Sequence, residues 1–322
     1  MTSIKPNSPN SNQVQHIEIE DEYAGQRLDN FLMTRLKGVP KTHIYRIIRK
    51  GEVRINKKRC KPLQKLQAGD VIRIPPVKLD NAKTAPDPSQ SALETLENSI
   101  IFEDKHFIII NKPSGFAVHG GSGISYGVIE GFRVLRPREK RMELVHRIDR
   151  DTSGCLIMAK KTSVLRAFHE MIRGDDMEKY YVALLKGCMD KDKILVDQPL
   201  RKFVTKSGER MVKIDPEGKA SKTIIYPTQR FKDATLADVK LLTGRTHQIR
   251  VHSQFLEHPI AGDDKYGDES FNKTMQGKGL KRLFLHARKL KFQHPVTGEL
   301  MEPIASLDNQ LTNVIKRLTN ES

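Results

Sequence analysis

The sequence predicts an α+β protein of two domains: a small basic module, followed by a larger domain built on a mixed, largely antiparallel sheet. Three observations support this prediction. The second half of the chain carries short apolar runs bounded by turn residues, which are typical of strands, and few helical patterns interrupt them. Positive charge is concentrated near the start, where positions 25–75 hold 14 Lys and Arg against 3 Asp and Glu. A Pro-rich stretch separates the two regions, and 322 residues suffice for two cores.

Two short helices and a pair of strands make up the predicted module. Apolar residues recur at helical spacing in two segments; Gly38 and Pro40 separate these segments, and Gly51 can cap the second one. The apolar positions are Leu28, Phe31, Leu32 and Leu36 in the first segment and Ile44, Ile47 and Ile48 in the second. The runs "VRIN" and "VIRI" then alternate with period two, as paired strands do.

Composition also sets the boundaries of the domains. We predict a disordered tail over residues 1–15, the basic module over 16–77, a polar, Pro-rich linker over 78–98 and the larger domain over 99–322. Six apolar runs of the larger domain are predicted strands: "HFIII", "ELVHRI", "CLIMA", "YYVALL", "ADVKLL" and "RLFLHA". Helices are predicted at "TSVLRAFHEMI", from His247 onward, and around Leu311, Val314, Ile315 and Leu318.

Several classes of protein and site are excluded by what the sequence lacks. No apolar run approaches the roughly 20 residues of a membrane helix and the start lacks a signal peptide, so we expect no membrane partner and a cytoplasmic location. The three cysteines are widely spaced, so a disulfide framework is not expected. The histidines His247 and His252 lie five positions apart, on different faces of a helix, so a metal site is not expected either. No nucleotide-binding loop appears, so we expect no cofactor.

Basic side chains of the module form a candidate phosphate-binding surface. Some share one side of the second helix and others crowd the loop that follows; they are Arg46, Arg49 and Lys50, then Lys57, Lys58 and Arg59. Such a run is often only solvated surface. The net charge of +11 within positions 25–75 favours binding to a polyanion instead.

Two further motifs place charged residues beside segments that should be buried. In "ELVHRIDRDTSGCLIMA", a predicted strand leads into a turn that holds Arg147, Asp149 and Arg150, and an ordinary Asx turn is the alternative explanation. In "LLTGRTHQIRVH", Arg245 opens a helix, where positive charge opposes the helix dipole and requires an anion nearby, either a carboxylate or an RNA phosphate. Spacing alone leaves open whether Asp149 and Arg245 meet.

The motif G-x-S-x-G around Ser125 matches the turn that presents a serine nucleophile in α/β-hydrolases. The strand that should precede this turn is missing, and so is the regular alternation of strands and helices that builds a parallel sheet. We therefore expect a loop at the mouth of a site here, and keep a serine hydrolase only as an alternative.

Longer motifs resemble two known families. The stretches "GQRLDNFL", "IYRIIRKGEVRINKKR" and "LQAGDVIRI" resemble the alpha-L RNA-binding module of the S4 type. The motifs "NKPSGFAVHGG", "HRIDRDTSG", "EKYYVAL", "LLTGRTHQIRVH", "GDDKYG" and "RLFLHA" follow in that order and resemble the RluA-type pseudouridine synthases. The chain is thus similar to a pseudouridine synthase catalytic domain with an S4-type module in front.

The resemblance also implies roles for single residues, carried over motif by motif. The catalytic positions are Asp149, Tyr181 and Arg245, with Leu241 packing in the pocket; the RNA-holding positions are His119, Arg147 and Arg150. Asp149 would act as a nucleophile or as the base that removes the ribose 2′ proton, and the sequence cannot choose between these roles. A pair with Arg245 would stabilise the charged form of Asp149.

The function implied by the resemblance is the isomerisation of uridine to pseudouridine in 23S rRNA of the large ribosomal subunit, by base flipping and without a cofactor or metal. The expected partner is this RNA or an assembly intermediate of the large subunit, and the expected state is a monomer. Uridines of other rRNA or of tRNA are alternative substrates. A ribosome-binding protein without catalysis is an alternative of another class.

Overall fold

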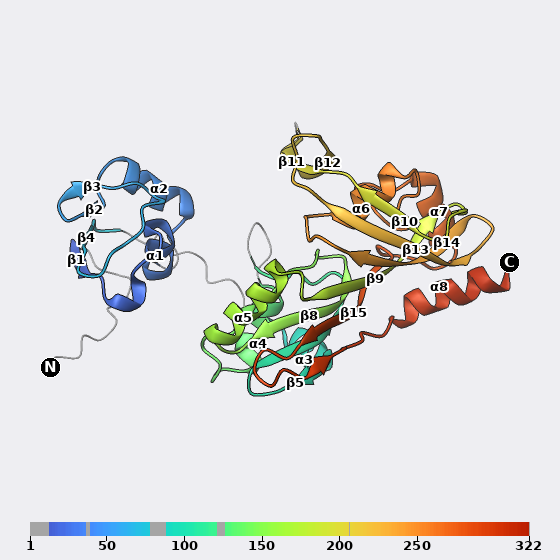
Figure 1. Cartoon of the computed structure of the whole chain (residues 1–322), viewed down its shortest axis with the longest axis horizontal. Helices are drawn as coiled ribbons and strands as arrows, with labels where there is room; N and C mark the ends of the chain where they lie inside the picture. The colour runs from blue at the N-terminus through green and yellow to red at the C-terminus, as the bar shows by residue number, and fades with distance from the viewer. Residues whose placement is uncertain (1–12, 37–38, 78–87, 121–125, 206, 322) are drawn as a thin grey trace. The chain divides into compact units, whose positions relative to one another are not determined.

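The computed structural model describes residues 13–36, 39–77, 88–120, 126–205 and 207–321. The chain divides into two compact units, residues 1–85 and 86–322, and each has its own hydrophobic core (Figure 1). Most of the predicted tail and the first part of the predicted linker lie outside the described residues. No helix in the part of the chain that the structure describes is long and apolar enough to cross a membrane.

The first unit packs two helices against a small antiparallel sheet of order β1-β4-β2-β3, which confirms the predicted architecture of the module. Its elements are β1 (Gln15–Glu18), η1 (Asp21–Tyr23), α1 (Leu28–Arg35), α2 (Lys41–Arg49), β2 (Arg54–Ile55), β3 (Lys58–Arg59) and β4 (Val71–Ile74). The apolar positions of both helices are buried, so the helical spacing marks the inward faces correctly. Strand β1 differs from the prediction, because Gln15, assigned to the tail, pairs with Ile74.

Two tight turns shape the basic side of this unit. Gly51 ends α2 with a φ of +74°, which a glycine adopts without strain, and its N–H donates to the carbonyl of Ile48. Asn56 and Lys57 both have positive φ and join β2 to β3 as a two-residue hairpin turn. The Asn56 side chain donates to Asp70 at 2.7 Å, which holds the turn in place.

A ten-stranded sheet forms the second unit. The main path runs β10-β13-β14-β9-β15-β8-β6-β5, with β7 beside β8 and β16 beside β15, and β11 and β12 form a separate hairpin. Among the described pairs only β15 and β8 are parallel, which confirms a mixed, largely antiparallel sheet. The strands are β5 (Ile100–Glu103), β6 (Phe107–Lys112), β7 (Glu143–Leu144), β8 (Ser153–Ala159), β9 (Glu178–Lys186), β10 (Ile194–Asp197), β11 (Leu200–Val204), β12 (Arg210–Ile214), β13 (Lys222–Arg230), β14 (Ala234–Leu241), β15 (Leu285–Gln293) and β16 (Leu300–Met301).

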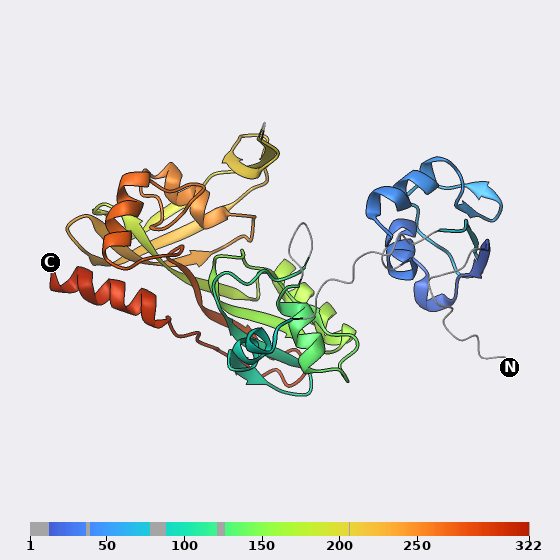
Figure 2. The ribbon, with the colours of Figure 1, turned by 180° about the vertical axis from the view of Figure 1, so that it is seen from behind.

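Helices cover both faces of the half-sheet that contains β6 and β8 (Figures 1 and 2). Phe168 of α5 packs with Ile109 and Ile157, whereas α3 and α4 pack with the alternate residues Ile108 and Met158. Strands buried on both faces are apolar throughout, which explains the continuous runs "HFIII" and "CLIMA". The helices of this unit are α3 (Gln90–Glu97), α4 (Val128–Leu135), α5 (Thr162–Arg173), α6 (Gln248–Phe255), α7 (Glu269–Gly277) and α8 (Asn309–Asn320).

Helix α3 corrects the predicted linker. The linker was expected to continue to residue 98, but Gln90–Glu97 is helical and belongs to the second unit. Ser89 caps the helix by accepting a hydrogen bond from the N–H of Ala92. Leu96 is fully buried in the main core of that unit. The polar composition of this stretch therefore belongs to the solvent side of a helix.

Strand β15 joins the two halves of the large sheet, because it lies between β9 and β8. At the junction Ser153 pairs with His286 and Gly154 pairs with Ala287. Gly154 has a φ of +109°, and a side chain there would approach the carbonyl oxygen of Ala287 to 2.2 Å. Only glycine fits this contact, so the glycine of "DTSG" fixes the point where the charged turn joins the sheet.

Candidate active site

The loop between β7 and β8 borders a cavity of about 280 Å³ in the second unit. The sequence predicts a strand through "ELVHRI", but regular pairing ends at Leu144, and the chain then turns to line the cavity from Val145 to Asp149. Four predicted positions meet there: Asp149 from this loop, Tyr181 from β9, Leu241 from the end of β14 and Arg245 ahead of α6. Segments far apart in the sequence thus form one site.

Asp149 has an arginine and a histidine as neighbours in this cavity. Arg250 Nη1 lies 3.7 Å and His247 Nε2 lies 3.9 Å from the same carboxylate oxygen, Oδ2. Arg245 is exposed, and its Nε donates to the carbonyl oxygen of Ala220 at 3.1 Å. The structure therefore differs from the expected pair of Asp149 with Arg245. The chain reverses at His247, whose φ is +54°, so Arg245 precedes this turn and Arg250 follows it on α6.

Arg250 is itself held by a buried carboxylate. Its Nε and Nη2 donate to the two oxygens of Asp263 at 2.7 and 2.6 Å, and both side chains are at most 5% exposed. Burial alone would lower the pKa of Arg250, but the hydrogen bonds and charge of Asp263, together with the charge of Asp149, raise it. The guanidinium thus stays charged beside Asp149. The sequence alone gives no role to Arg250 or Asp263, although they lie in the motifs "LLTGRTHQIRVH" and "GDDKYG".

Tyr181 forms the buried wall of the cavity. It pairs with Val239 across β9 and β14 and is 9% exposed. Burial, and then the charge of Asp149, raise the pKa of its hydroxyl, so the phenol stays neutral. Leu241 lies at the end of the neighbouring strand, opposite Lys179. An aromatic ring and an aliphatic side chain beside a carboxylate suit a flat, uncharged ring as ligand.

Further basic residues line the same cavity. Burial, and then the charge of Lys179, lower the pKa of His146 to about 3, so this imidazole is neutral. Its Nε2 accepts a hydrogen bond from the N–H of Ile157 at 3.3 Å. Burial also lowers the pKa of Lys179. Arg147 lines the cavity and is exposed to solvent.

The loop that carries Asp149 is supported from behind by Lys112. This side chain is fully buried, and its Nζ donates to the carbonyl oxygens of Pro113, Phe116 and Arg150 at 2.8 to 2.9 Å. Burial lowers the pKa of Lys112 to about 7, with the charges of Asp151 and Asp149 opposing this effect. The lysine of "NKPSG" thus ties that segment to the residue after Asp149.

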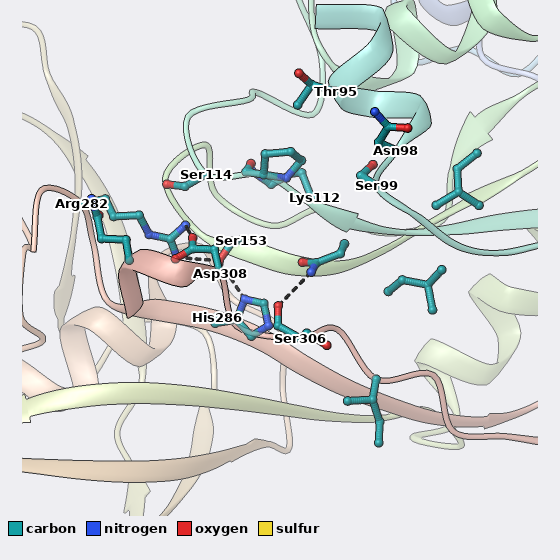
Figure 3. A pocket seen from close by; sticks show the side chains of 16 residues that line it. Thr95, Asn98, Ser99, Lys112, Ser114, Ser153, Arg282, His286, Ser306 and Asp308 are labelled. Carbon is teal, nitrogen blue, oxygen red and sulfur yellow. Dashed lines mark hydrogen bonds and ion pairs between the residues drawn. The ribbon is translucent and has the colours of Figure 1, made fainter. Parts of the chain in front are cut away.

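A second cavity of about 810 Å³ lies on the Lys112 side of this loop (Figure 3). Its charged and polar groups bind one another: Arg282 donates to Ser153 at 2.6 Å and pairs with Asp308 at 3.0 Å. The hydroxyl of Ser153 in turn lies 2.8 Å from Nδ1 of His286. Figure 3 marks this contact with a dashed line. This cavity contains none of the predicted site residues, although it is the larger one. We interpret the bonded residues that line this cavity as the support of the turn at Ser153.

The other predicted residues lie outside the cavity around Asp149. His119 is exposed, with Nδ1 4.0 Å from Glu130, and Arg150 is exposed and donates to Asp151 at 3.1 Å. Ser125 falls outside the described residues. In the first unit, the six predicted basic residues are all exposed: Arg46, Arg49, Lys50, Lys57, Lys58 and Arg59. Across the described part of the chain, no group of His, Cys, Asp or Glu is arranged to hold a metal ion.

Comparisons with known proteins agree with this arrangement. Residues 106–255 match the family model of RNA pseudouridylate synthase, and residues 26–72 match the S4 domain. The chain is 53% identical to "Ribosomal large subunit pseudouridine synthase C" of Salmonella typhimurium over 95% of this chain and 97% of the relative. The protein of that name from Escherichia coli K12 is 52% identical, again over 95% and 97% of the two chains.

Solved structures show the same fold. The human "RNA Pseudouridylate Synthase Domain Containing 4" superposes with a TM-score of 0.59 and 24% identity, over 70% of this chain and 95% of the human one. The human "RNA Pseudouridylate Synthase Domain Containing 1" gives a TM-score of 0.54 and 22% identity, over 73% and 98% of the two chains.

Proposed function

The chain belongs to the RNA pseudouridylate synthase family, and from this premise we propose that it isomerises uridine to pseudouridine in 23S rRNA of the large ribosomal subunit. One observation carries the proposal. A partly buried carboxylate, Asp149, stands between a charged guanidinium, Arg250, and a buried tyrosine, Tyr181, in a cavity of about 280 Å³. Relatives that share half of the sequence bear the name of a large-subunit enzyme.

The reaction itself sets modest demands on the protein. The bond between N1 of uracil and C1′ of ribose breaks, the base turns, and a bond between C5 and C1′ forms. The proton that leaves C5 is balanced by the one that N1 gains, so no atom or electron is exchanged with a cofactor. The protein needs a reactive carboxylate, a wall for the base and a way to extract the nucleotide from RNA.

Asp149 is the proposed reactive group, as a nucleophile or as the base on the ribose 2′ position. The charge of Arg250 favours the ionised carboxylate, because an opposite charge nearby stabilises it. Tyr181 offers its ring for stacking on the base, and Leu241 packs beside it. Arg147, which lines the cavity and is exposed, is assigned to holding the displaced RNA strand.

Binding to folded RNA is assigned to the basic surface of the first unit. A family match to the S4 domain and six exposed basic side chains support this assignment. Electrostatic contacts with phosphates offset the few kcal/mol that base flipping costs. We further propose that the enzyme acts in the cytoplasm, where large subunits are assembled, and as a monomer.

Substitution of the carboxylate tests the function directly. The Asp149→Asn variant should form no pseudouridine in a 23S rRNA fragment in single-turnover assays, while its affinity for that fragment is retained. Asp151→Asn is the matched control, since Asp151 is 44% exposed and pairs with Arg150. It should keep most of the rate. Product formation by Asp149→Asn at a rate comparable to the wild type would overturn the assignment. A separate experiment, mapping of pseudouridines in rRNA from cells with and without the protein, would identify the target positions.

A further inference from the structure

His247 connects Asp149 to a buried tyrosine that the reaction described above does not use. Its Nε2 faces Asp149 at 3.9 Å, and its Nδ1 lies 2.8 Å from the hydroxyl oxygen of Tyr266. That hydroxyl also accepts a hydrogen bond from the backbone N–H of Val212 on β12 at 2.9 Å. A continuous series of contacts thus runs from the β11–β12 hairpin to the carboxylate.

The hydrogen bonds in this series favour one position of the protons. A backbone N–H can only donate, so the Tyr266 oxygen accepts from Val212. Nδ1 of His247 is the one acceptor that the described residues offer to the buried Tyr266 proton, and a proton on Nδ1 would leave that hydroxyl proton without a partner. A neutral imidazole that accepts at Nδ1 carries its proton on Nε2. Burial, and then the charges of Arg250 and Lys265, lower the pKa of His247 against the opposing charges of Asp149 and Asp263. The neutral ring therefore directs an N–H toward Asp149.

Tyr266 contacts both neighbours of Asp149. Its ring lies 5.1 Å from the guanidinium carbon of Arg250, and its side chain is 3% exposed. Asp263, which binds Arg250, also accepts the backbone N–H of Tyr266 at 3.0 Å. The segment "GDDKYG" therefore holds Arg250 through its aspartate and His247 through its tyrosine.

The backbone supports a role beyond packing. His247 has a φ of +54°, a conformation that non-glycine residues seldom adopt and that often accompanies function. Arg250 and His247 both approach Oδ2 of Asp149, at 3.7 and 3.9 Å, and neither of these two contacts uses Oδ1. One oxygen of the carboxylate thus faces these two side chains, and the other remains for a substrate.

We propose that Tyr266 is a positioning residue that holds His247 with its proton on Nε2, and that His247 and Arg250 together anchor Oδ2 of Asp149 so that Oδ1 is the oxygen that reacts. The inference rests on the proposed function and adds to it. It assigns a role to the tyrosine of "GDDKYG" and links the position of the hairpin to the reactive carboxylate.

A double-mutant cycle tests this coupling in the full chain. Tyr266→Phe removes the hydroxyl and keeps the ring, and it should slow single-turnover isomerisation by about three- to tenfold, the value of one hydrogen bond. His247→Gln keeps an N–H donor near the position of Nε2 and does not need Tyr266. In that background, Tyr266→Phe should change the rate by less than about twofold. An equal loss in both backgrounds would mean that Tyr266 only supports the fold, and would overturn the proposal.

Two controls accompany the cycle. His247→Leu removes the donor, and should be slower than His247→Gln. Tyr180→Phe removes the hydroxyl of a partly buried tyrosine, which donates to Glu178 two positions earlier on β9, and should leave the rate unchanged. Tyr266→Phe also removes the hydrogen bond from Val212. This loss of stability is the same with His247 and with Gln at position 247, so it does not contribute to the coupling that the cycle measures.

A readout independent of catalysis separates this inference from the proposed function. The ¹⁵N shifts of the His247 ring, assigned by their loss in His247→Gln, should show an unprotonated Nδ1 and a protonated Nε2 at neutral pH. Tyr266→Phe should mix the two tautomers. A protonated Nδ1 in the wild type would refute the inference even if pseudouridine forms. If the wild type formed no pseudouridine, the proposed function would be refuted. The ¹⁵N shifts would still decide whether Tyr266 holds the proton of His247 on Nε2.

Discussion

Arg245 and Arg250 lie in one motif, yet only Arg250 reaches Asp149. Arg250 is buried, forms two hydrogen bonds with Asp263 and pairs with Asp149, whereas Arg245 is exposed and bonded to a backbone carbonyl. A planar guanidinium can serve both carboxylates because its donors point in fixed directions. A lysine cannot replace it at such a site.

Matched lysine substitutions distinguish the two arginines. Arg250→Lys keeps the charge but loses the two-pronged bond to Asp263, so we expect single-turnover rate to fall by at least about tenfold, the equivalent of roughly 1.4 kcal/mol. Arg245→Lys should keep nearly the full rate and weaken RNA affinity at most. Single-turnover kinetics with saturating RNA measure both effects, and thermal melting shows whether each variant is folded. If Arg245→Lys were also much slower, the result would favour the pair of Asp149 with Arg245 that the resemblance implies.

At this scale the sequence predicts the residue types of the site better than their contacts. The motifs place Asp149, Tyr181, Leu241 and Arg245 in one cavity, as the structure does. The partner of Asp149 could not be predicted, because the turn at His247 decides which arginine faces the carboxylate. Asp263, which binds Arg250 from 13 positions further along the chain, lies beyond α6, and its spacing carries no signal of this contact.

Among the elements, α3 has the largest effect on how the chain can be divided. It begins at Gln90, inside the predicted linker, and Leu96 packs in the core. A side chain added to Gly131 of α4 would meet Leu96 at 2.4 Å, so the two helices are in close contact. Glu97 also pairs with Arg136 at 2.9 Å. The signal was present as Ala92 and Leu96 one turn apart, but an eight-residue helix after a Pro-rich stretch gives little periodicity.

Two truncated chains test the place of α3. A chain that begins at residue 86 keeps the second unit whole, whereas one that begins at residue 98 loses the helix and uncovers the core around Phe132. The free energy of unfolding of the shorter chain should be lower by about 2–5 kcal/mol, because the truncation of a single buried leucine already costs this much. Denaturant unfolding measures the difference. Equal midpoints and slopes would show that α3 contributes nothing to this unit.

For the molecule as a whole, the excess of positive charge and the proposed active site lie in different units. Positions 25–75 carry +11 of the net charge of +17, while Asp149 and its partners belong to the second unit. Composition and apolar spacing were enough to predict this division, because a basic surface and two separate cores are properties of long segments. The contacts that build the active site depend on single turns and were not predictable in the same way.

The division predicts how salt affects RNA binding. Loss of three or four phosphate contacts should flatten the slope of log affinity against log salt by about two to four units. Removal of residues 1–85 should produce this change, and replacement of Arg46, Arg49 and Lys50 by Gln in the full chain should produce part of it. Single-turnover rate at saturating RNA should change much less than affinity. An unchanged salt slope in both proteins would mean that the first unit does not bind RNA phosphates.

The position of β15 also decides when the enzyme is complete during its synthesis. This strand, residues 285–293, is the bridge between β9 and β8, although it begins 126 positions after β8 ends. Asp149 belongs to the β8 half, and Tyr181 and Arg250 belong to the other half. A nascent chain on the ribosome can fold the first unit early, but it cannot close the catalytic cavity until β15 has left the exit tunnel. The cavity around Asp149 can therefore close only after residues 285–293 have been made.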